Sequence, residues 1–195
     1  MPHPPTTYGA AAAGHTPLPA AATWGLLAAW ALHDAEELIT MPGWARRARP
    51  RLEAALPAVP GAVWDRLDVS RSHTATAIGL MGIVMAAAAA DGARTGGRSP
   101  FYQAALAGFG LHTVTHLAQS ALTRGYTPGV VTAPLVAAPF SLWAWGRLRR
   151  AGVPAAAPGT GSLLLVPVVL GSVHGLASAV ERARARRRAL PRRRR

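Results

Sequence analysis

The sequence predicts an all-α fold, a polytopic membrane helix bundle of about five transmembrane helices. Half of the 195 residues are apolar, and they gather in five stretches. Each stretch is close to the ~20 residues that a helix needs to cross a bilayer. The chain has 21 arginines and no lysine, and most of the arginines flank these stretches. The stretches cover residues 20–41, 73–90, 103–122, 129–145 and 161–180.

The two ends of the chain differ from the middle. Residues 1–19 are rich in proline, threonine, glycine and alanine without periodicity, and they predict a disordered N-terminal tail. Residues 20–181 make up the predicted membrane domain. Residues 182–195 form a polybasic cytoplasmic tail with nine of the 21 arginines. Its expected partners are anionic lipid headgroups, at ~1 kcal/mol or less per arginine. Nucleic acid is not expected, because the arginines form no stripe on a soluble fold.

Prolines interrupt the last two stretches. A proline kinks an isolated helix, but neighbouring helices in a membrane bundle can satisfy the freed carbonyls. The positions are Pro128, Pro134, Pro139 and Pro167. The string Tyr126-Thr127-Pro128-Gly129 predicts a turn that starts the fourth helix, with Thr127 as N-cap and Pro128 as the first helical residue.

The arginine distribution predicts an orientation. Residues 44–71 interleave charged side chains with tryptophan, leucine and valine, which is typical of an interfacial amphipathic segment. With five spans, this loop lies on the same side as Arg124 and the C-terminal tail, and that side receives sixteen arginines against five on the other. Because cytoplasmic loops carry the excess of positive charge, we expect a multi-pass protein of the cell membrane with its N-terminus outside and its C-terminus in the cytoplasm.

The first stretch contains the strongest functional signal. His33, Glu36 and Glu37 follow an uninterrupted apolar run. Their spacings of three and four residues place them on one face of a helix. A charged side chain near the bilayer centre costs about 2.5–3.5 kcal/mol, so such groups normally mark a functional site.

Histidines of two further stretches are expected at the same depth. His112 and His116 are four residues apart in the third stretch, and His174 lies in the fifth. The first, third and fifth helices run in one direction, which puts His33, His116 and His174 each roughly 4–6 Å past the midpoint of its helix, at ~1.5 Å per residue. The chain has no cysteine, so a metal must be held by imidazole and carboxylate. The candidate ligands are His33, Glu36, Glu37, His112, His116 and His174.

These ligands predict a divalent metal site, with zinc favoured and iron or manganese as alternatives. Glu36 and Glu37 are the predicted catalytic residues, one ligating the metal and the other acting as general base on metal-bound water, whose pKa falls to about 7. The corresponding reaction is hydrolysis of an amphipathic or lipid-like substrate, and a di-iron oxidase would use the same ligands. Two other functions stay open: a proton or cation carrier, and a structural membrane module without metal.

With His33, Glu36 and Glu37 placed in a membrane stretch, the chain resembles the HXXEE family, a group of largely bacterial multi-pass membrane proteins named for that motif. The pair His112 and His116, followed by residues 126–129, is similar to what these proteins carry downstream of the motif. The resemblance covers roughly residues 20–180 and implies that the three motif residues are the signature group. It implies no substrate, because the function of the family is not established.

Overall fold

All regular secondary structure in the computed structural model is helical. The structure describes residues 17–156 and 160–189. In the last helix it describes the side chains of residues 168–187. This part of the chain forms seven α-helices, one π-helical turn and no strand, which confirms the all-α prediction. Residues 1–16 of the predicted N-terminal tail lie outside it. The elements are α1 (Ala20–Thr40), α2 (Trp44–Ala55), α3 (Gly61–Leu67), α4 (Arg71–Arg94), α5 (Pro100–Leu122), η1 (Ala133–Ala137), α6 (Ala138–Arg150) and α7 (Thr160–Ala189).

Local sequence explains where two of the long helices begin. The Ser70 hydroxyl accepts the His73 backbone N–H at 3.0 Å before α4, and the Ser99 hydroxyl accepts that of Tyr102 at 3.1 Å before α5. Each hydroxyl satisfies one of the free amides of a first helical turn. Pro100, which has no N–H, follows Ser99 as the first residue of α5.

The fourth predicted stretch does not form one regular α-helix. Gly129 has a left-handed backbone with φ +81°, the chain turns around it, and helical backbone begins only at Thr132, directly before η1. Thr127 and Pro128 are therefore not the N-cap and first residue of a helix, and that prediction was wrong. The two prolines that follow lack the N–H of a normal α-helical bond, so the backbone widens, and the Ala138 N–H donates to the carbonyl of Ala133, five residues earlier.

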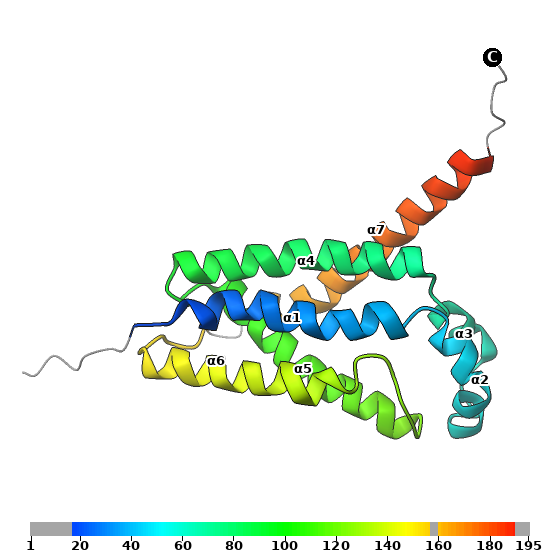
Figure 1. Cartoon of the computed structure of the whole chain (residues 1–195), viewed down its shortest axis with the longest axis horizontal. Helices are drawn as coiled ribbons and strands as arrows, with labels where there is room; N and C mark the ends of the chain where they lie inside the picture. Colours follow the sequence, from blue (N-terminus) through cyan, green and yellow to red (C-terminus); the bar gives the residue numbers. More distant parts are fainter. Residues whose placement is uncertain (1–16, 157–159, 190–195) are drawn as a thin grey trace, which may run out of the picture.

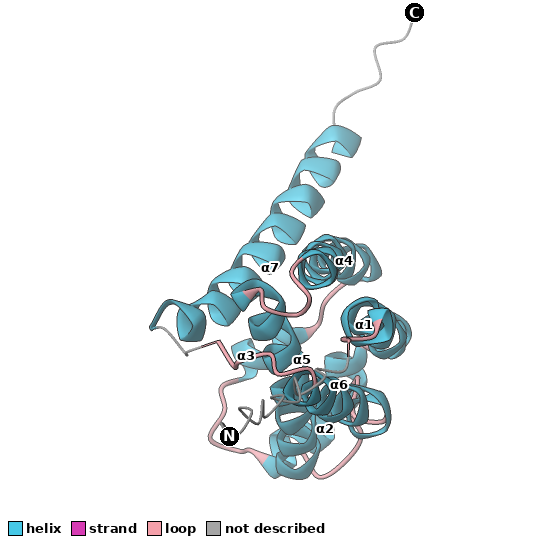
Figure 2. Ribbon diagram, turned by 90° about the vertical axis from the view of Figure 1, so that its left-hand side faces the viewer, coloured by secondary structure: helices cyan, strands magenta, loops and turns pink. Residues whose placement is uncertain are grey.

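Successive long helices run in alternating directions, so that α1, α5 and α7 run opposite to α4 and α6 (Figure 1). The α1 helix packs along α4 and against α6, and α5 packs on the same two helices. The α7 helix contacts α4 and projects obliquely beyond the bundle (Figure 2). The short helices α2 and α3 lie beside the end of the bundle where α1 ends and α4 begins (Figure 1).

An apolar core fills the half of the bundle that is farther from α2. It consists mainly of large side chains from α1, α5 and α6, among them Leu26, Trp30, Tyr102, Leu106 and Leu148. Tyr102 lies directly on α4, because a Cβ at Gly92 would come within 2.5 Å of its ring. The histidines and carboxylates of α1 and α5 follow this core in the sequence, so they collect in the half nearer α2.

The predicted number of transmembrane helices is not confirmed. Among the described residues, α4 is the one helix that is long and apolar enough to cross a membrane. The α1 helix carries three carboxylates, Asp34, Glu36 and Glu37, and α6 has only 13 residues. The structure therefore supports one membrane-spanning helix by length and composition.

Candidate metal centre

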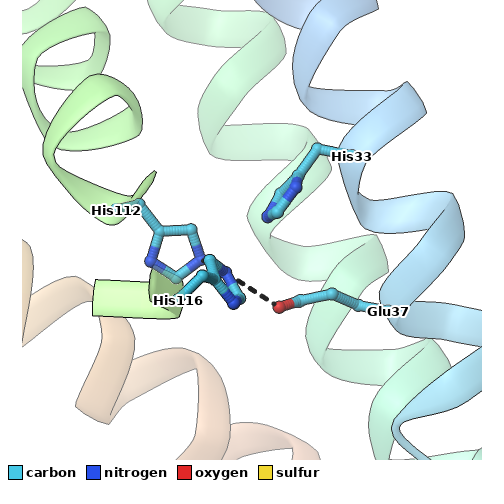
Figure 3. Close-up of side chains that lie close together, drawn as sticks. All are labelled: His33, Glu37, His112 and His116. Carbon is cyan, nitrogen blue, oxygen red and sulfur yellow. Dashed lines mark hydrogen bonds and ion pairs between the residues drawn. The ribbon is translucent and has the colours of Figure 1, made fainter. Parts of the chain in front are cut away.

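Four of the six predicted ligands come together between α1 and α5. His33 and Glu37 are one turn apart on α1, and His112 and His116 are one turn apart on α5. Figure 3 shows the four side chains converging, and one ligand atom from each lies within 4.8 Å of all the others. With zinc–nitrogen bonds of about 2.0–2.1 Å, the ligands of a tetrahedral site lie roughly 3.3 Å apart. Side-chain movements of about 1.5 Å or less would thus bring this group to metal-binding distances.

The closest contacts in the group join atoms that bind metals. Nε2 of His116 lies 2.8 Å from Nε2 of His112 and 3.4 Å from Oε1 of Glu37. The rings of His33 and His116 meet edge to face, with centroids 4.9 Å apart. His33 is fully buried and His116 is 4 % exposed. Burying this many ionisable groups is unfavourable unless they are compensated, and a divalent cation among them would supply the compensation.

A chain of hydrogen bonds assigns the tautomer of His33. The Thr132 hydroxyl donates to Oε2 of Glu36 at 2.6 Å, and the Thr132 backbone N–H donates to the same oxygen at 2.8 Å. A hydroxyl has a single proton, so its oxygen accepts from Nδ1 of His33, 2.8 Å away. The lone pair of His33 is then on Nε2, which is buried and has no hydrogen-bond partner in the described part of the chain. A carboxylate that orients a histidine and leaves its other nitrogen free is the usual outer shell of a metal site.

Glu36 belongs to this outer shell and not to the four-residue group. Besides Thr132, its carboxylate accepts the Tyr126 hydroxyl at 2.7 Å and the Val131 backbone N–H at 3.4 Å. Desolvation by burial, together with the hydrogen bond to the Glu36 carboxylate and its charge, raises the pKa of the Tyr126 phenol above its ordinary 10.0. The phenol therefore remains a donor at neutral pH. The physical reason for the split between the two glutamates is their ~100° separation on α1: Glu37 faces α5, and Glu36 faces the loop before η1.

The loop of residues 126–132 covers the group, and this role was missed in the sequence. At Gly129 a Cβ would lie 2.4 Å from Cε1 of His116 and 3.0 Å from Oε1 of Glu37. The loop backbone can approach this closely only because residue 129 has no side chain. A signal was present, since residues 126–129 are part of the pattern that resembles the HXXEE family, but a simple turn explained them equally well.

The sixth predicted ligand, His174, lies elsewhere. Nδ1 of His174 is 3.1 Å from Nε2 of His73, and the two rings stack with centroids 5.4 Å apart. Nδ1 of His73 lies 3.8 Å from Oε2 of Glu181. The sequence could not show that α7 packs on α4, outside the contact between α1 and α5.

Comparison with known proteins agrees with the motif. A family model described as a protein of unknown function with an HXXEE motif matches residues 24–144, more than half of the chain. The matched segment contains the four clustered residues and the covering loop, and it ends before α7. No curated protein and no solved structure matches the chain.

Proposed function

The chain belongs to the family of proteins of unknown function with an HXXEE motif, and from its own residues we propose that it is a metal-dependent membrane hydrolase. The observation that carries the proposal is the group of His33, Glu37, His112 and His116, whose ligand atoms lie within 4.8 Å of one another. A free, buried and oriented Nε2 on His33 supports it. Three imidazole ligands with a carboxylate beside them suit zinc best, and iron or manganese remain alternatives.

Each residue has a role in this proposal. His33, His112 and His116 would hold the metal through their imidazole nitrogens, as three histidines do in some catalytic zinc sites. A bound divalent metal acidifies water and polarises a carbonyl or phosphoryl oxygen. Glu37, whose Oε1 lies 3.4 Å from Nε2 of His116, would take a proton from the attacking water. It returns the proton to the leaving oxygen as the water oxygen bonds to the electrophilic carbon or phosphorus. Glu36 is a positioning residue that acts through Thr132 on His33.

The surface of the bundle supports a multi-pass membrane location. Its inner residues include histidines and carboxylates, whereas large aliphatic side chains on the outside are 67–75 % exposed. Such an inverted pattern is expected where lipid is the solvent, since polar groups in a membrane face the bundle interior. The exposed residues come from α1, α4, α5, η1 and α6, and they include Ile39, Ile83, Leu111, Leu135 and Leu142.

An apolar groove of about 510 Å³ indicates the kind of substrate. Its walls are α1 on one side and η1 and α6 on the other, from Ala21 to Leu32 and from Leu135 to Trp143. At 1.5 Å per residue the α1 wall is about 16 Å long. Leu32 stands one turn before Glu36, and Leu135 stands one turn after Thr132. One end of the groove thus lies within a helical turn of Glu36 and Thr132, and its apolar lining fits the hydrocarbon chain of an amphipathic substrate.

Metal analysis of the detergent-purified protein tests the proposal. The wild type should contain about one zinc per chain, and His112→Ala should lose it. X-ray absorption should count three imidazoles around the metal. Glu37→Gln should keep bound metal and lose hydrolytic activity, as expected of a proton acceptor.

The matched control is His174→Ala, because this histidine also lies on a long helix but pairs with His73. It should bind zinc like the wild type. A wild type without metal, or loss of zinc in His174→Ala but not in His112→Ala, would contradict the proposal.

The orientation has an independent test, since the chain has no cysteine to remove. Single cysteines can replace the exposed residues Arg98, before α5, and Arg66, in α3. With the N-terminus outside, an impermeant maleimide added to intact cells should label Arg98→Cys and spare Arg66→Cys. The reverse labelling would invert the orientation, and equal labelling of both would argue against the membrane location.

The carrier alternative is less well supported. A path across the bilayer needs polar groups along its whole length. In this bundle, the half farther from α2 is filled by the apolar core around Leu26, Tyr102 and Leu106. A structural module without metal would be favoured if His33→Ala left both stability and metal content unchanged.

A further inference from the structure

The arginines of α2 divide into two groups. Arg46 pairs with Asp68 at 2.5 Å. Arg49 pairs with Glu53 at 2.5 Å and with Asp65 at 2.6 Å. Both are therefore neutralised by carboxylates of the same surface segment, and their charge is accounted for within the fold.

Arg47 and Arg51 have no carboxylate partner within salt-bridge distance among the described residues. Arg47 donates to the carbonyls of Pro42 and Thr40, at 3.0 and 3.2 Å. Arg51 donates to the carbonyl of Tyr126 at 2.8 Å, and its Nε is buried without a hydrogen-bond partner. Two guanidinium groups one turn apart thus carry positive charge that the neighbouring side chains do not compensate.

These two arginines line an open surface cavity of about 280 Å³. Its other walls are Trp44, Ala48 and Tyr126. Trp44, Arg47, Ala48 and Arg51 recur at three- and four-residue intervals, so they form one face of α2. The guanidinium of Arg51 lies against the loop at Gly125, where a Cβ would come within 2.0 Å of it. The loop sequence therefore leaves room for this arginine.

Tyr126 connects the cavity with the candidate metal ligands. Its carbonyl accepts from Arg51 and, at 3.1 Å, from the Trp44 indole, while its hydroxyl donates to Glu36. One tyrosine side chain thus separates the two arginines from the carboxylate that orients His33 through Thr132. The apolar groove ends at Leu32 on α1, one helical turn before the same carboxylate.

We infer that the cavity between α2 and Tyr126 binds the phosphate-bearing head of the amphipathic substrate. This inference rests on the proposed function. Guanidinium groups bind phosphate oxygens through paired, charge-assisted hydrogen bonds. Two arginines in one cavity whose charge no described carboxylate neutralises match a doubly charged head. Trp44 and Tyr126 supply the amphipathic aromatic walls that suit a membrane interface. On this inference the head lies in the cavity and the hydrocarbon chain of the same substrate lies in the groove.

Equilibrium binding of dodecyl phosphate to the purified protein in neutral maltoside micelles tests the inference. The wild type should bind it, and Arg47→Gln and Arg51→Gln should each weaken binding by about tenfold or more, as expected for a lost hydrogen bond to a charged group. Arg46→Gln removes the same charge from the ion-paired face of α2 and should change the dissociation constant by less than about twofold. Arg47 is exposed and donates only to backbone carbonyls, so its replacement tests the cavity even where Arg51→Gln disturbs the loop.

Two further measurements test whether the arginines or a metal hold the phosphate, and whether the cavity prefers an amphipathic phosphate to free phosphate. Metal-free His112→Ala should still bind dodecyl phosphate, which shows that the arginines and not the metal hold the phosphate. Inorganic phosphate should bind much more weakly than dodecyl phosphate. Equal affinity for the two would overturn the inference, because the cavity would then serve a free anion. Equal losses in Arg46→Gln and Arg51→Gln would also overturn it.

Zinc content measured on the same samples keeps the two proposals apart. A wild type that contains zinc but does not bind dodecyl phosphate would refute the head-group cavity and leave the hydrolase. A wild type that binds dodecyl phosphate but no zinc would refute the hydrolase and retain the cavity as an anion site.

Discussion

Thr132→Val is the sharpest test of how the four clustered residues His33, Glu37, His112 and His116 are oriented for metal binding. Valine has nearly the shape of threonine but cannot donate to Glu36 or accept from His33. The change therefore removes two side-chain contacts, at 2.6 and 2.8 Å, and keeps the backbone N–H bond from residue 132 to Glu36. Because none of the four clustered residues is altered, any loss of affinity measures the orienting effect alone.

The expected magnitude follows from the type of contact. Loss of an outer-shell partner of a metal-binding histidine lowers metal affinity about 10- to 100-fold, which is about 1.4 to 2.7 kcal/mol. The assay is competition for zinc between the protein and a chelator of known affinity. We expect Thr132→Val to bind zinc 10- to 100-fold more weakly than the wild type.

Thr113→Val is the matched control. Thr113 is buried next to His112 in the sequence, but its hydroxyl donates to the carbonyl of Ala133 at 3.2 Å and not to a residue of the group. Its zinc affinity should stay within about twofold of the wild type, as expected when no outer-shell bond is lost. The reasoning is refuted if Thr132→Val binds zinc as tightly as the wild type, or if both variants lose affinity equally.

Three other outcomes are expected. Gly129→Ala should lower the melting temperature, since an alanine at φ +81° costs about 1–2 kcal/mol and its Cβ would meet His116. The control is Gly79→Ala, in an open helical position, which should be neutral or stabilising. An equal effect of the two changes would contradict the close approach of the loop. The phenol of Tyr126 should ionise above pH 10.0, which ultraviolet titration of the wild type against Tyr126→Phe can measure. Since folding raises this pKa, its contribution to stability is present below the unfolded pKa and is lost as the pH rises through the folded one; ionisation at or below pH 10.0 would be the opposite result. Zinc should leave the protein on acidification, because protons compete for the three imidazoles; full retention in dialysis at low pH would show that the histidines are not ligands.

The positions of the helices could be read from the sequence because they depend on local properties. Apolar runs about 20 residues long predicted α1, α4 and α5 to within a few residues. Ser99 and Pro100 mark a helix start through bonds within the first turn. The irregular η1 was missed, because whether two prolines kink a helix or widen it into a π-turn depends on the packing around them.

By itself, the sequence determined the two pairs of histidine-bearing faces. Residues four apart share a face of any α-helix. His33 and Glu37 therefore point to the same side of their helix, as do His112 and His116. Only the tertiary structure decided that these two faces meet, that Glu36 turns to Thr132, and that α7 carries His174 away to α4. The physical reason is that helical periodicity sets directions around one axis, whereas the rotation and neighbours of each helix follow from packing over the whole bundle.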